Sequence, residues 1–303
     1  MKQNITLTVE PSLIEIMREY YTAFMVNNEG EYVDFQAEAN GVIITAFTSK
    51  KSTRKVTFFG EDALKEAQIW NPNAVESEKK EATKEKWIFF ENQIGSDEVG
   101  VGDFLGPMIV VAAYVGKKDI SRLIELGIHD SKKMKDKQIL EVGEILVKEF
   151  KFSKLTLKNE KYNEMLDKGE NLNSMKAKMH NRALLNMCKE FPDVLNVFID
   201  QFVKPETYYG YLNDANEEQV KDIISRTKGE SHFPCVALAS VIARYSYLKE
   251  MEKLSETYQM EFPFGASKKV TEFAKKFVEK YGVEEFNKIA KKNFANYNEV
   301  LNQ

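Results

Sequence analysis

The chain has 303 residues, of which 43% are hydrophobic and 30% are charged, and this composition predicts a globular protein with a substantial core and two domains. Its 43 basic and 47 acidic side chains give a formal net charge of −4, which excludes an indiscriminately basic nucleic-acid-binding protein. Any site for a polyanion must therefore be a local basic patch, or must be made attractive by bound metal.

The N-terminal region is predicted to alternate between strands and helices. Residues 4–9 alternate between polar and apolar side chains, as a half-buried strand does, and Pro11 opens a helix. Asn40-Gly41 is a strong hairpin signal. The remaining predicted elements are strands at residues 32–37, 42–47 and 55–59 and a helix at residues 61–70. This order predicts a small α+β domain over residues 1–71.

A basic segment lies in the hairpin loop between the second and third of these later strands. Its four cations are Lys50, Lys51, Arg54 and Lys55, with two hydroxyl side chains among them. Such a loop suits binding to nucleic-acid phosphates. It suits equally a solvated hairpin tip whose lysines protect the strand edges, and both interpretations stay open.

A change of composition marks the predicted domain boundary. Asn71-Pro72-Asn73 breaks the pattern of elements, and the residues that follow are mostly Glu, Lys, Ser and Thr. Residues 72–86 are therefore predicted to be a charged linker, and residues 87–303 a second, larger domain.

The second domain opens with two short apolar runs around a glycine-rich turn, between Trp87 and Val115. Runs of this length bounded by Gly and Pro predict a hairpin of two strands, with Asp97 and Glu98 at the end of the first. Buried acids are costly unless neutralised, and a hard divalent cation does this. The alternative is a solvated turn. Adjacent strand residues point to opposite faces, so both acids serve one site only if the strand ends or twists at Asp97.

The rest of the chain is predicted to alternate between helices and strands. The expected elements are helices at 117–126, 135–150, from 171 onward, 236–251, 268–281 and 283–296, and strands at 152–157 and 194–199. Before the second helix, Asp130-Ser131 either supplies its N-cap or, with Lys132 and Lys133, holds a backbone phosphate. The cations at 176, 178 and 182 either form a solvated face or line a substrate.

Two further acids complete a set of four candidates. Asp200 comes directly after an apolar run, where active sites of open α/β sheets collect. Glu230 follows Lys228-Gly229, and its alternative is an ordinary loop acid. Clustered carboxylates without His or Cys suit Mg²⁺ or Mn²⁺. Two such ions can clamp the attacking and leaving oxygens of an in-line phosphoryl displacement.

Other classes of protein are not indicated. Cys188 and Cys235 are the two cysteines, and no CxxC occurs, so neither a disulfide framework nor a zinc site is expected. No apolar run reaches the length of a membrane span, and the polar N-terminus does not resemble a signal peptide. We therefore expect a cytoplasmic protein and, without a coiled-coil seam, a monomer.

Four motifs in chain order resemble those of the prokaryotic type 2 ribonucleases H. They are Ile94–Asp103 with Gly106-Pro107, Asp130–Lys133, Phe198–Asp200, and Lys228–Ser231 leading into residues 237–244. Within that group the chain resembles the ribonuclease HIII subfamily. That likeness rests on the N-terminal domain with its linker, on Glu230 where ribonuclease HII usually has Asp, and on residues 171–181.

The resemblance implies a ribonuclease H fold, a mixed five-stranded sheet flanked by helices, preceded by a small α+β domain similar to half of a TATA-binding protein. It implies endonucleolytic cleavage of RNA in an RNA–DNA hybrid, leaving 5′-phosphate and 3′-hydroxyl ends. The catalytic and metal-binding residues carried over are Asp97, Glu98, Asp200 and Glu230, with two Mg²⁺ or Mn²⁺ ions and Asp97 bridging both.

The same resemblance implies how the substrate is held. Gly100 and Gly102 would bring backbone groups against 2′-hydroxyls in the minor groove of the hybrid. Val101 stands where ribonuclease HII has Arg and where ribonuclease HIII often has Thr. We therefore predict that cleavage needs a run of ribonucleotides rather than a single embedded one.

Two alternatives follow from the same features. One is a non-catalytic module that only binds the hybrid, and the presence of all four acids argues against it. The other is a ribonuclease HII-like enzyme that cuts at DNA–RNA junctions, and Val101 argues against that.

Overall fold

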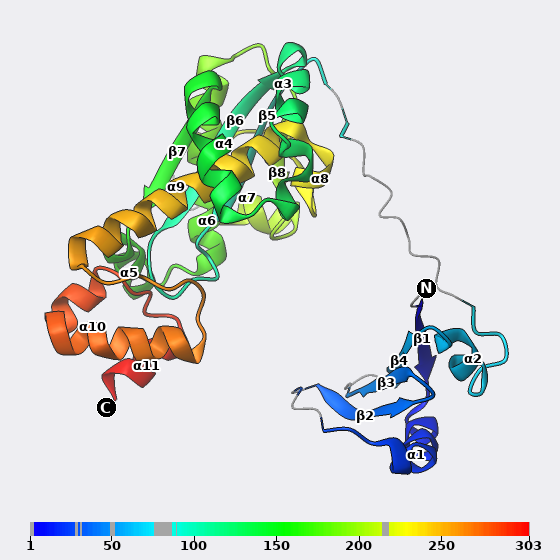
Figure 1. Ribbon diagram of the computed structural model, residues 1–303. Helices are drawn as coiled ribbons and strands as arrows, with labels where there is room; N and C mark the ends of the chain where they lie inside the picture. The colour runs from blue at the N-terminus through cyan, green and yellow to red at the C-terminus, as the bar shows by residue number, and fades with distance from the viewer. Residues whose placement is uncertain are drawn as a thin grey trace. The chain divides into compact units, whose positions relative to one another are not determined.

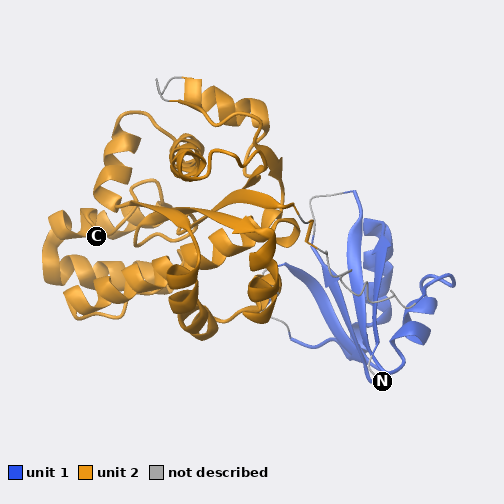
Figure 2. Ribbon diagram, turned by 90° about the horizontal axis from the view of Figure 1, so that it is seen from above, with its two compact units in different colours: residues 1–84 blue, residues 85–303 orange. Residues whose placement is uncertain are grey.

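The computed structural model describes residues 3–27, 30, 32–48, 52–75, 87–88, 90–213 and 218–302. The chain divides into two compact units, residues 1–84 and residues 85–303 (Figure 2). Each has its own hydrophobic core. Within the described residues, no helix has the length and apolar character needed to cross a membrane.

The N-terminal unit is an antiparallel sheet packed on helices. Its strands lie in the order β1-β4-β3-β2. The elements are β1 (Gln3–Val9), α1 (Pro11–Tyr20), the 3₁₀ turn η1 (Thr22–Phe24), β2 (Val33–Ala39), β3 (Val42–Phe47), β4 (Arg54–Gly60) and α2 (Ala63–Gln68). Asn40 and Gly41 both have positive φ, 54° and 72°, as the tight β2–β3 hairpin requires. The predicted α+β domain is confirmed, with strand boundaries shifted by one or two residues.

The C-terminal unit is built on a mixed five-stranded sheet in the order β7-β6-β5-β8-β9 (Figure 1). Its strands are β5 (Asn92–Val99), β6 (Met108–Gly116), β7 (Phe152–Leu157), β8 (Val197–Asp200) and β9 (Ile224–Arg226). The first three strands pair antiparallel, whereas β8 and β9 run parallel to β5. This confirms the predicted mixed sheet.

Helices cover both faces of this sheet. Alternate residues of β6 point to opposite sides, so Val111 and Ala113 pack with residues of α9, whereas Val110 and Ala112 pack with residues of α6. The helices are α3 (Ile120–Glu125), α4 (Asp136–Glu149), α5 (Asn159–Asp167), α6 (Leu172–Glu190), α7 (Pro205–Asn213), α8 (Gly229–His232), α9 (Pro234–Tyr258), α10 (Lys268–Asn287) and α11 (Ala295–Leu301). Two 3₁₀ turns, η2 (Lys117–Asp119) and η3 (Ile128–Lys133), complete the unit.

Some elements differ from the sequence prediction. The helices α5 and α7 and the short strand β9 were not predicted. A last helix over residues 283–296 is wrong, because α10 continues past a non-helical Gly282 to Asn287 and α11 begins only at Ala295. The proposed Asp130-Ser131 N-cap is also wrong. Helix α4 begins after Lys135, whose backbone N–H donates to the Gln138 side chain at 3.0 Å.

Candidate active site

Three neighbouring elements carry the four acids. Asp97 and Glu98 lie on β5, and Asp200 is the last residue of β8, which pairs with β5 up to Ser96 and Ile199. Glu230 lies on α8, next to Gly229, whose backbone N–H donates to Asp200 Oδ1 at 2.8 Å. The sheet and this one hydrogen bond therefore bring acids from distant parts of the sequence to the same edge.

Asp97 is the most buried acid of the group. Burial raises the pKa of Asp97 well above its usual range, and the nearby carboxylates of Glu98 and Asp200 raise it further. Hydrogen bonds from Ser240 and from the Glu98 backbone N–H, at 2.8 Å, act in the opposite direction. Asp97 thus lies in a field of negative charge that its own hydrogen bonds do not offset.

Asp200 has a similar but milder environment. Burial raises the pKa of Asp200, the hydrogen bond from Gly229 lowers it, and repulsion from Glu230 and Glu98 raises it again. The carboxylates are thus close enough for each to raise the pKa of its neighbours.

Glu98 faces the opposite side of the sheet from Asp97. Its carboxylate forms an ion pair with Lys176 and contacts His180 Nε2 at 2.9 Å, and both residues are on α6. His180 is held in turn by Ser96 Oγ, 2.8 Å from its Nδ1. Burial alone would raise the pKa of Glu98, but His180 and Lys176 outweigh burial and lower it to about 2. The strand does not end at Asp97, so the pleat separates the two acids as strand geometry requires.

Glu230 combines one paired and one unpaired oxygen. Its Oε1 lies 2.5 Å from Lys132 Nζ, which also donates to Ser231 Oγ at 3.1 Å. Its Oε2 is buried and has no hydrogen-bond partner among the described residues. Beside it is a pocket of about 210 Å³. The pocket is lined by Glu98, Val99, Ser131, Lys132, Ile139, Glu230, Ser240, Val241 and Arg244.

The donor chemistry of these acids fits a hard divalent cation, although their present arrangement is open. Among the described residues, no three His, Cys, Asp or Glu side chains are gathered closely enough to hold a metal ion. The reason is that Glu98 is turned toward Lys176 and Glu230 toward Lys132. The unsatisfied Glu230 Oε2 and the charge repulsion at Asp97 are what a cation with oxygen ligands would relieve.

The glycine-rich turn after β5 divides into a packed part and an open part. Gly100 has φ +83°, and a Cβ there would lie 2.3 Å from the Pro107 carbonyl oxygen, so the chain itself requires glycine. At Gly102 a Cβ would meet nothing within 4 Å. Val101 between them is half-buried against the cluster that contains Met108 and Tyr162. Gly102 is therefore the glycine here with room for an approaching molecule.

The predicted phosphate-binding cations have different surroundings. Ser131 lines the 210 Å³ pocket, and Lys132 bridges into it, whereas Lys133 is exposed. In the N-terminal unit, Arg54 and Lys55 begin β4 rather than lying in the loop before it. Arg54 is ion-paired with Asp34 at 3.2 Å, whereas Lys55 is exposed. Lys50 and Lys51 lie outside the described residues.

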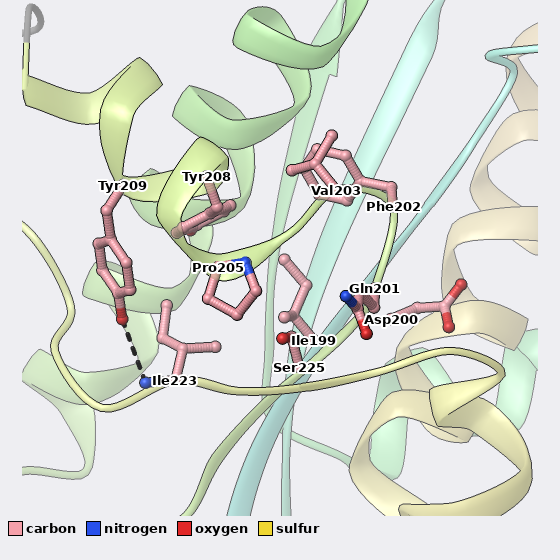
Figure 3. Close-up of a pocket in the computed structure, with 10 residues that line it drawn as sticks. All are labelled: Ile199, Asp200, Gln201, Phe202, Val203, Pro205, Tyr208, Tyr209, Ile223 and Ser225. Atoms are coloured by element: carbon pink, nitrogen blue, oxygen red, sulfur yellow. Dashed lines mark hydrogen bonds between the residues drawn. The ribbon is translucent and has the colours of Figure 1, made fainter.

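A second, smaller hollow lies beside Asp200. It is lined by Ile199, Asp200, Gln201, Phe202, Val203, Pro205, Tyr208, Tyr209, Ile223 and Ser225 (Figure 3). Its volume is about 10 Å³, which is barely enough for one water molecule. Figure 3 shows the Asp200 carboxylate directed away from Tyr208 and Tyr209. This hollow is too small for a ligand larger than a water molecule.

Sequence reasoning missed several residues of the site. It noted the cation at 176 but not its contact with Glu98, and it left out His180, Ser240 and Arg244. One signal was available: Lys176 and His180 are four residues apart, so they share one helix face. Arg244 lines the pocket and forms a two-pronged ion pair with Asp136 at 2.9 and 3.0 Å. The sequence does not show that this face of α6 meets Glu98, because that contact depends on tertiary packing.

Comparisons with known proteins show the family to which the chain belongs. A family model described as Ribonuclease HII matches residues 94–297, and one described as Domain of unknown function (DUF3378) matches residues 4–84. Ribonuclease HIII from Bacillus cereus is 38% identical, covering 99% of each chain. Ribonuclease HIII from Bacillus licheniformis is also 38% identical, covering 96% of this chain and 95% of the relative.

Solved structures show the same likeness. The crystal structure of Bst-RNase HIII in complex with Mn²⁺ matches with a TM-score of 0.69 and 31% identity, covering 99% of this chain and 98% of that chain. Aquifex aeolicus RNase H3 matches at a TM-score of 0.54 and 23% identity over 95% of this chain and 99% of that one, which supports the fold alone. The chain therefore belongs to the ribonuclease HIII family, within the wider group that the ribonuclease HII family model describes.

Proposed function

We propose that this protein is an endoribonuclease that hydrolyses the RNA strand of RNA–DNA hybrids. We propose further that Asp97, Glu98, Asp200 and Glu230 hold two divalent cations for this reaction. The observation that carries the assignment of residues is the convergence of these acids, with mutual repulsion and one unpaired buried oxygen, at neighbouring ends of β5, β8 and α8. Membership of the ribonuclease HIII family supports the activity.

The donor set determines what the cations would supply. Bound Mg²⁺ or Mn²⁺ would neutralise the clustered carboxylates and provide the Lewis-acid chemistry of an in-line phosphoryl displacement. Asp97 would be the central ligand of these cations, because it interacts with both Glu98 and Asp200 and is the most buried of the four. Glu230 contributes its unpaired Oε2, and Ser240 and the Gly229 N–H fix the carboxylates of Asp97 and Asp200 in place.

The remaining polar groups of the pocket are suited to the substrate backbone. Lys132 and Arg244 place two cations on the pocket wall, and Ser131 adds a hydroxyl, so a phosphate of the hybrid can be bound beside the acids. Hydrolysis at that phosphate with in-line attack by water leaves 5′-phosphate and 3′-hydroxyl ends. The chain itself provides positioning and charge compensation rather than a covalent nucleophile.

Selection of RNA is assigned to the turn after β5. Gly102 is exposed and open, so its backbone can approach a 2′-hydroxyl, whereas Gly100 shapes the turn that presents it. Val101 offers no cation at this position, which supports a requirement for a run of ribonucleotides. The N-terminal unit, with its exposed Lys55, is assigned to hybrid binding.

The deciding experiment compares two end-labelled duplexes with added Mg²⁺ or Mn²⁺. One is an RNA–DNA hybrid, and the other is DNA with a single embedded ribonucleotide. Cleavage of the hybrid alone, lost in Asp97→Asn, is the expected result. Efficient cleavage at the single ribonucleotide would contradict the interpretation of Val101, and cleavage of neither duplex would favour a hybrid-binding module. The monomeric state and the cytoplasmic location stay predictions.

A further inference from the structure

Lys176 is a buried cation directly beside the candidate metal site. Its side chain is 8% exposed, and its Nζ forms an ion pair with Glu98 Oε1, whose own side chain is 10% exposed. On the other side the ammonium lies 3.9 Å from the ring centroid of Phe202, two residues after Asp200. Its charge also acts on Asp200. Lys176 is therefore held by Glu98 on β5 and by Phe202, which follows the end of β8.

The Glu98 carboxylate is committed to α6 on both of its oxygens. Oε1 is held by Lys176 and Oε2 by His180, which lies one helical turn further along the same helix. Asp97, the neighbouring residue, is bonded to Ser240 on α9 instead. Lys176 and His180 thus hold Glu98 on the opposite face of the sheet from Asp97, and Glu98 must leave them, at least in part, to share a cation with Asp97.

The positive charge of Lys176 is favourable when the site holds no metal and unfavourable when two cations are bound. Two divalent cations would fully neutralise four carboxylates, so the ammonium becomes surplus charge when both ions are bound. Without the ions, the same ammonium is the best-shielded positive charge in contact with the acids. Lys132 plays a smaller part, because its side chain is 50% exposed and its charge is screened by solvent.

Resting on the metal-binding role proposed above, we infer that Lys176 is a positioning residue that acts as a built-in counterion. It holds Glu98 in a metal-free position and is displaced from it when divalent cations bind. Lys176 therefore stabilises the metal-free protein and weakens cation binding. The two effects are coupled, because the charge that pairs with Glu98 in the metal-free protein is the charge that opposes the cations when they bind.

The test measures Mn²⁺ binding to the full chain without substrate, by calorimetry and by the spin-resonance signal of free Mn²⁺. Lys176→Gln keeps a hydrogen-bond donor for Glu98 and removes the charge. Mn²⁺ affinity is expected to rise about tenfold, as a coupling of this kind commonly gives. In EDTA the melting temperature should fall below that of the parent, and added Mn²⁺ should raise it by more than in the parent.

Lys178→Gln is the matched control. Lys178 is two residues along the same helix and is also ion-paired with a glutamate, Glu170, but it does not contact the four acids. Its substitution should leave Mn²⁺ affinity unchanged. Lys176→Arg, which keeps the charge, should also bind Mn²⁺ as the parent does. In a Glu98→Gln background, Lys176→Gln should have a much smaller effect on Mn²⁺ affinity, because only the influence of its charge on Asp200 remains. That double variant also lacks the unpaired buried acid that could impair folding.

The outcomes separate this inference from the proposed function. Equal or weaker Mn²⁺ binding by folded Lys176→Gln overturns the inference, and so does an effect of undiminished size in the Glu98→Gln background. If Asp97→Asn still abolishes Mn²⁺ binding in those cases, the proposed metal site stands. If the parent binds no Mn²⁺, or Asp97→Asn binds it equally well, the proposed metal site fails and this inference fails with it.

Discussion

At the scale of single residues, two neighbours on one strand have opposite electrostatic environments. Asp97 is buried among carboxylates, so its pKa is raised, whereas the pKa of Glu98 is lowered to about 2 by two cationic or hydrogen-bonding partners that outweigh burial. Residues next to each other in sequence thus have different roles, because the pleat directs one toward α9 and the other toward α6. The less compensated of the two, Asp97, is where a cation would relieve most repulsion.

Asp97→Asn is therefore predicted to remove activity and to leave the fold intact. The amide keeps the size of the side chain and can still accept from Ser240, but it contributes no charge to cation binding. Turnover should fall by on the order of a thousandfold or more. Hybrid binding in EDTA, measured by fluorescence anisotropy, should be unchanged, and lost binding there would contradict the assignment of Asp97 to catalysis rather than to substrate affinity.

A second residue with an unusual environment is Lys291, which is fully buried behind the glycine-rich turn. Its Nζ donates to the carbonyl oxygens of Asp103 and Gly106, at 2.7 and 2.6 Å. Burial lowers the pKa of Lys291 from 10.5 to about 7, although Asp103 acts to raise it. Above pH 7 the folded state therefore holds fewer protons at this residue than the unfolded state does.

This difference predicts a pH dependence of stability with a definite sign. Because unfolding takes up a proton between about pH 7 and pH 10, the free energy of unfolding should rise with pH in this window, by at most ~1.4 kcal/mol per pH unit. Urea denaturation in EDTA at several pH values measures the slope. Lys291→Met should flatten it, whereas Lys292→Met, which removes a partly exposed lysine paired with Asp167, should leave it unchanged. Equal slopes in parent and Lys291→Met would refute the prediction.

At the scale of elements, the turn between β5 and β6 contains three glycines, and two of them, Gly100 and Gly102, have different reasons to be glycine. Gly100 has a positive φ and no room for a Cβ, whereas Gly102 has neither constraint. A structural requirement within the chain explains Gly100, but nothing within the described structure explains Gly102. In the proposed function, the close approach of the substrate explains Gly102.

The pair therefore gives a matched test. Gly100→Ala should lower the free energy of unfolding by at least about 2 kcal/mol, because it combines backbone strain with a clash against Pro107. Gly102→Ala should change stability by less than about 0.5 kcal/mol but should raise the Michaelis constant for the hybrid several-fold. Thermal or urea unfolding and steady-state cleavage measure the two effects. A normal Michaelis constant for Gly102→Ala would remove this glycine from the substrate surface.

Elements also show what the sequence could predict. Periodicity located most strands and helices, because alternation and apolar faces are local properties. The strand β9 was not predicted, because three residues are too few to show a period. The last helix was misplaced, because α10 continues past the non-helical Gly282. Asp97, Glu98 and Asp200 were proposed from their places after apolar runs, whereas Glu230 was assigned through the fourth family motif. Lys176 and His180 were not connected with Glu98, because that contact joins residues about eighty positions apart and depends on which face of α6 packs against the sheet.

At the scale of the whole molecule, the chain separates into two units with independent cores. The core of the N-terminal unit contains residues from Ile5 to Ala74, and the cores of the C-terminal unit begin at Trp87. All four acids, the pocket beside them and Lys176 belong to the C-terminal unit. Truncation can therefore separate the chemical step, which belongs to the C-terminal unit, from the hybrid affinity proposed for the N-terminal unit.

Deleting residues 1–71 is predicted to weaken hybrid binding more than it slows the chemical step. The C-terminal unit keeps its sheet and its acids, so turnover at saturating hybrid should change by no more than about threefold, whereas loss of a separate binding module should raise the Michaelis constant by about tenfold or more. Steady-state cleavage of a labelled hybrid by both proteins measures both constants, and circular dichroism checks that the truncated chain is folded. An unchanged Michaelis constant would show that the N-terminal unit adds no affinity. A large loss of turnover with normal binding would instead mean that this unit sets the register of the hybrid against the acids.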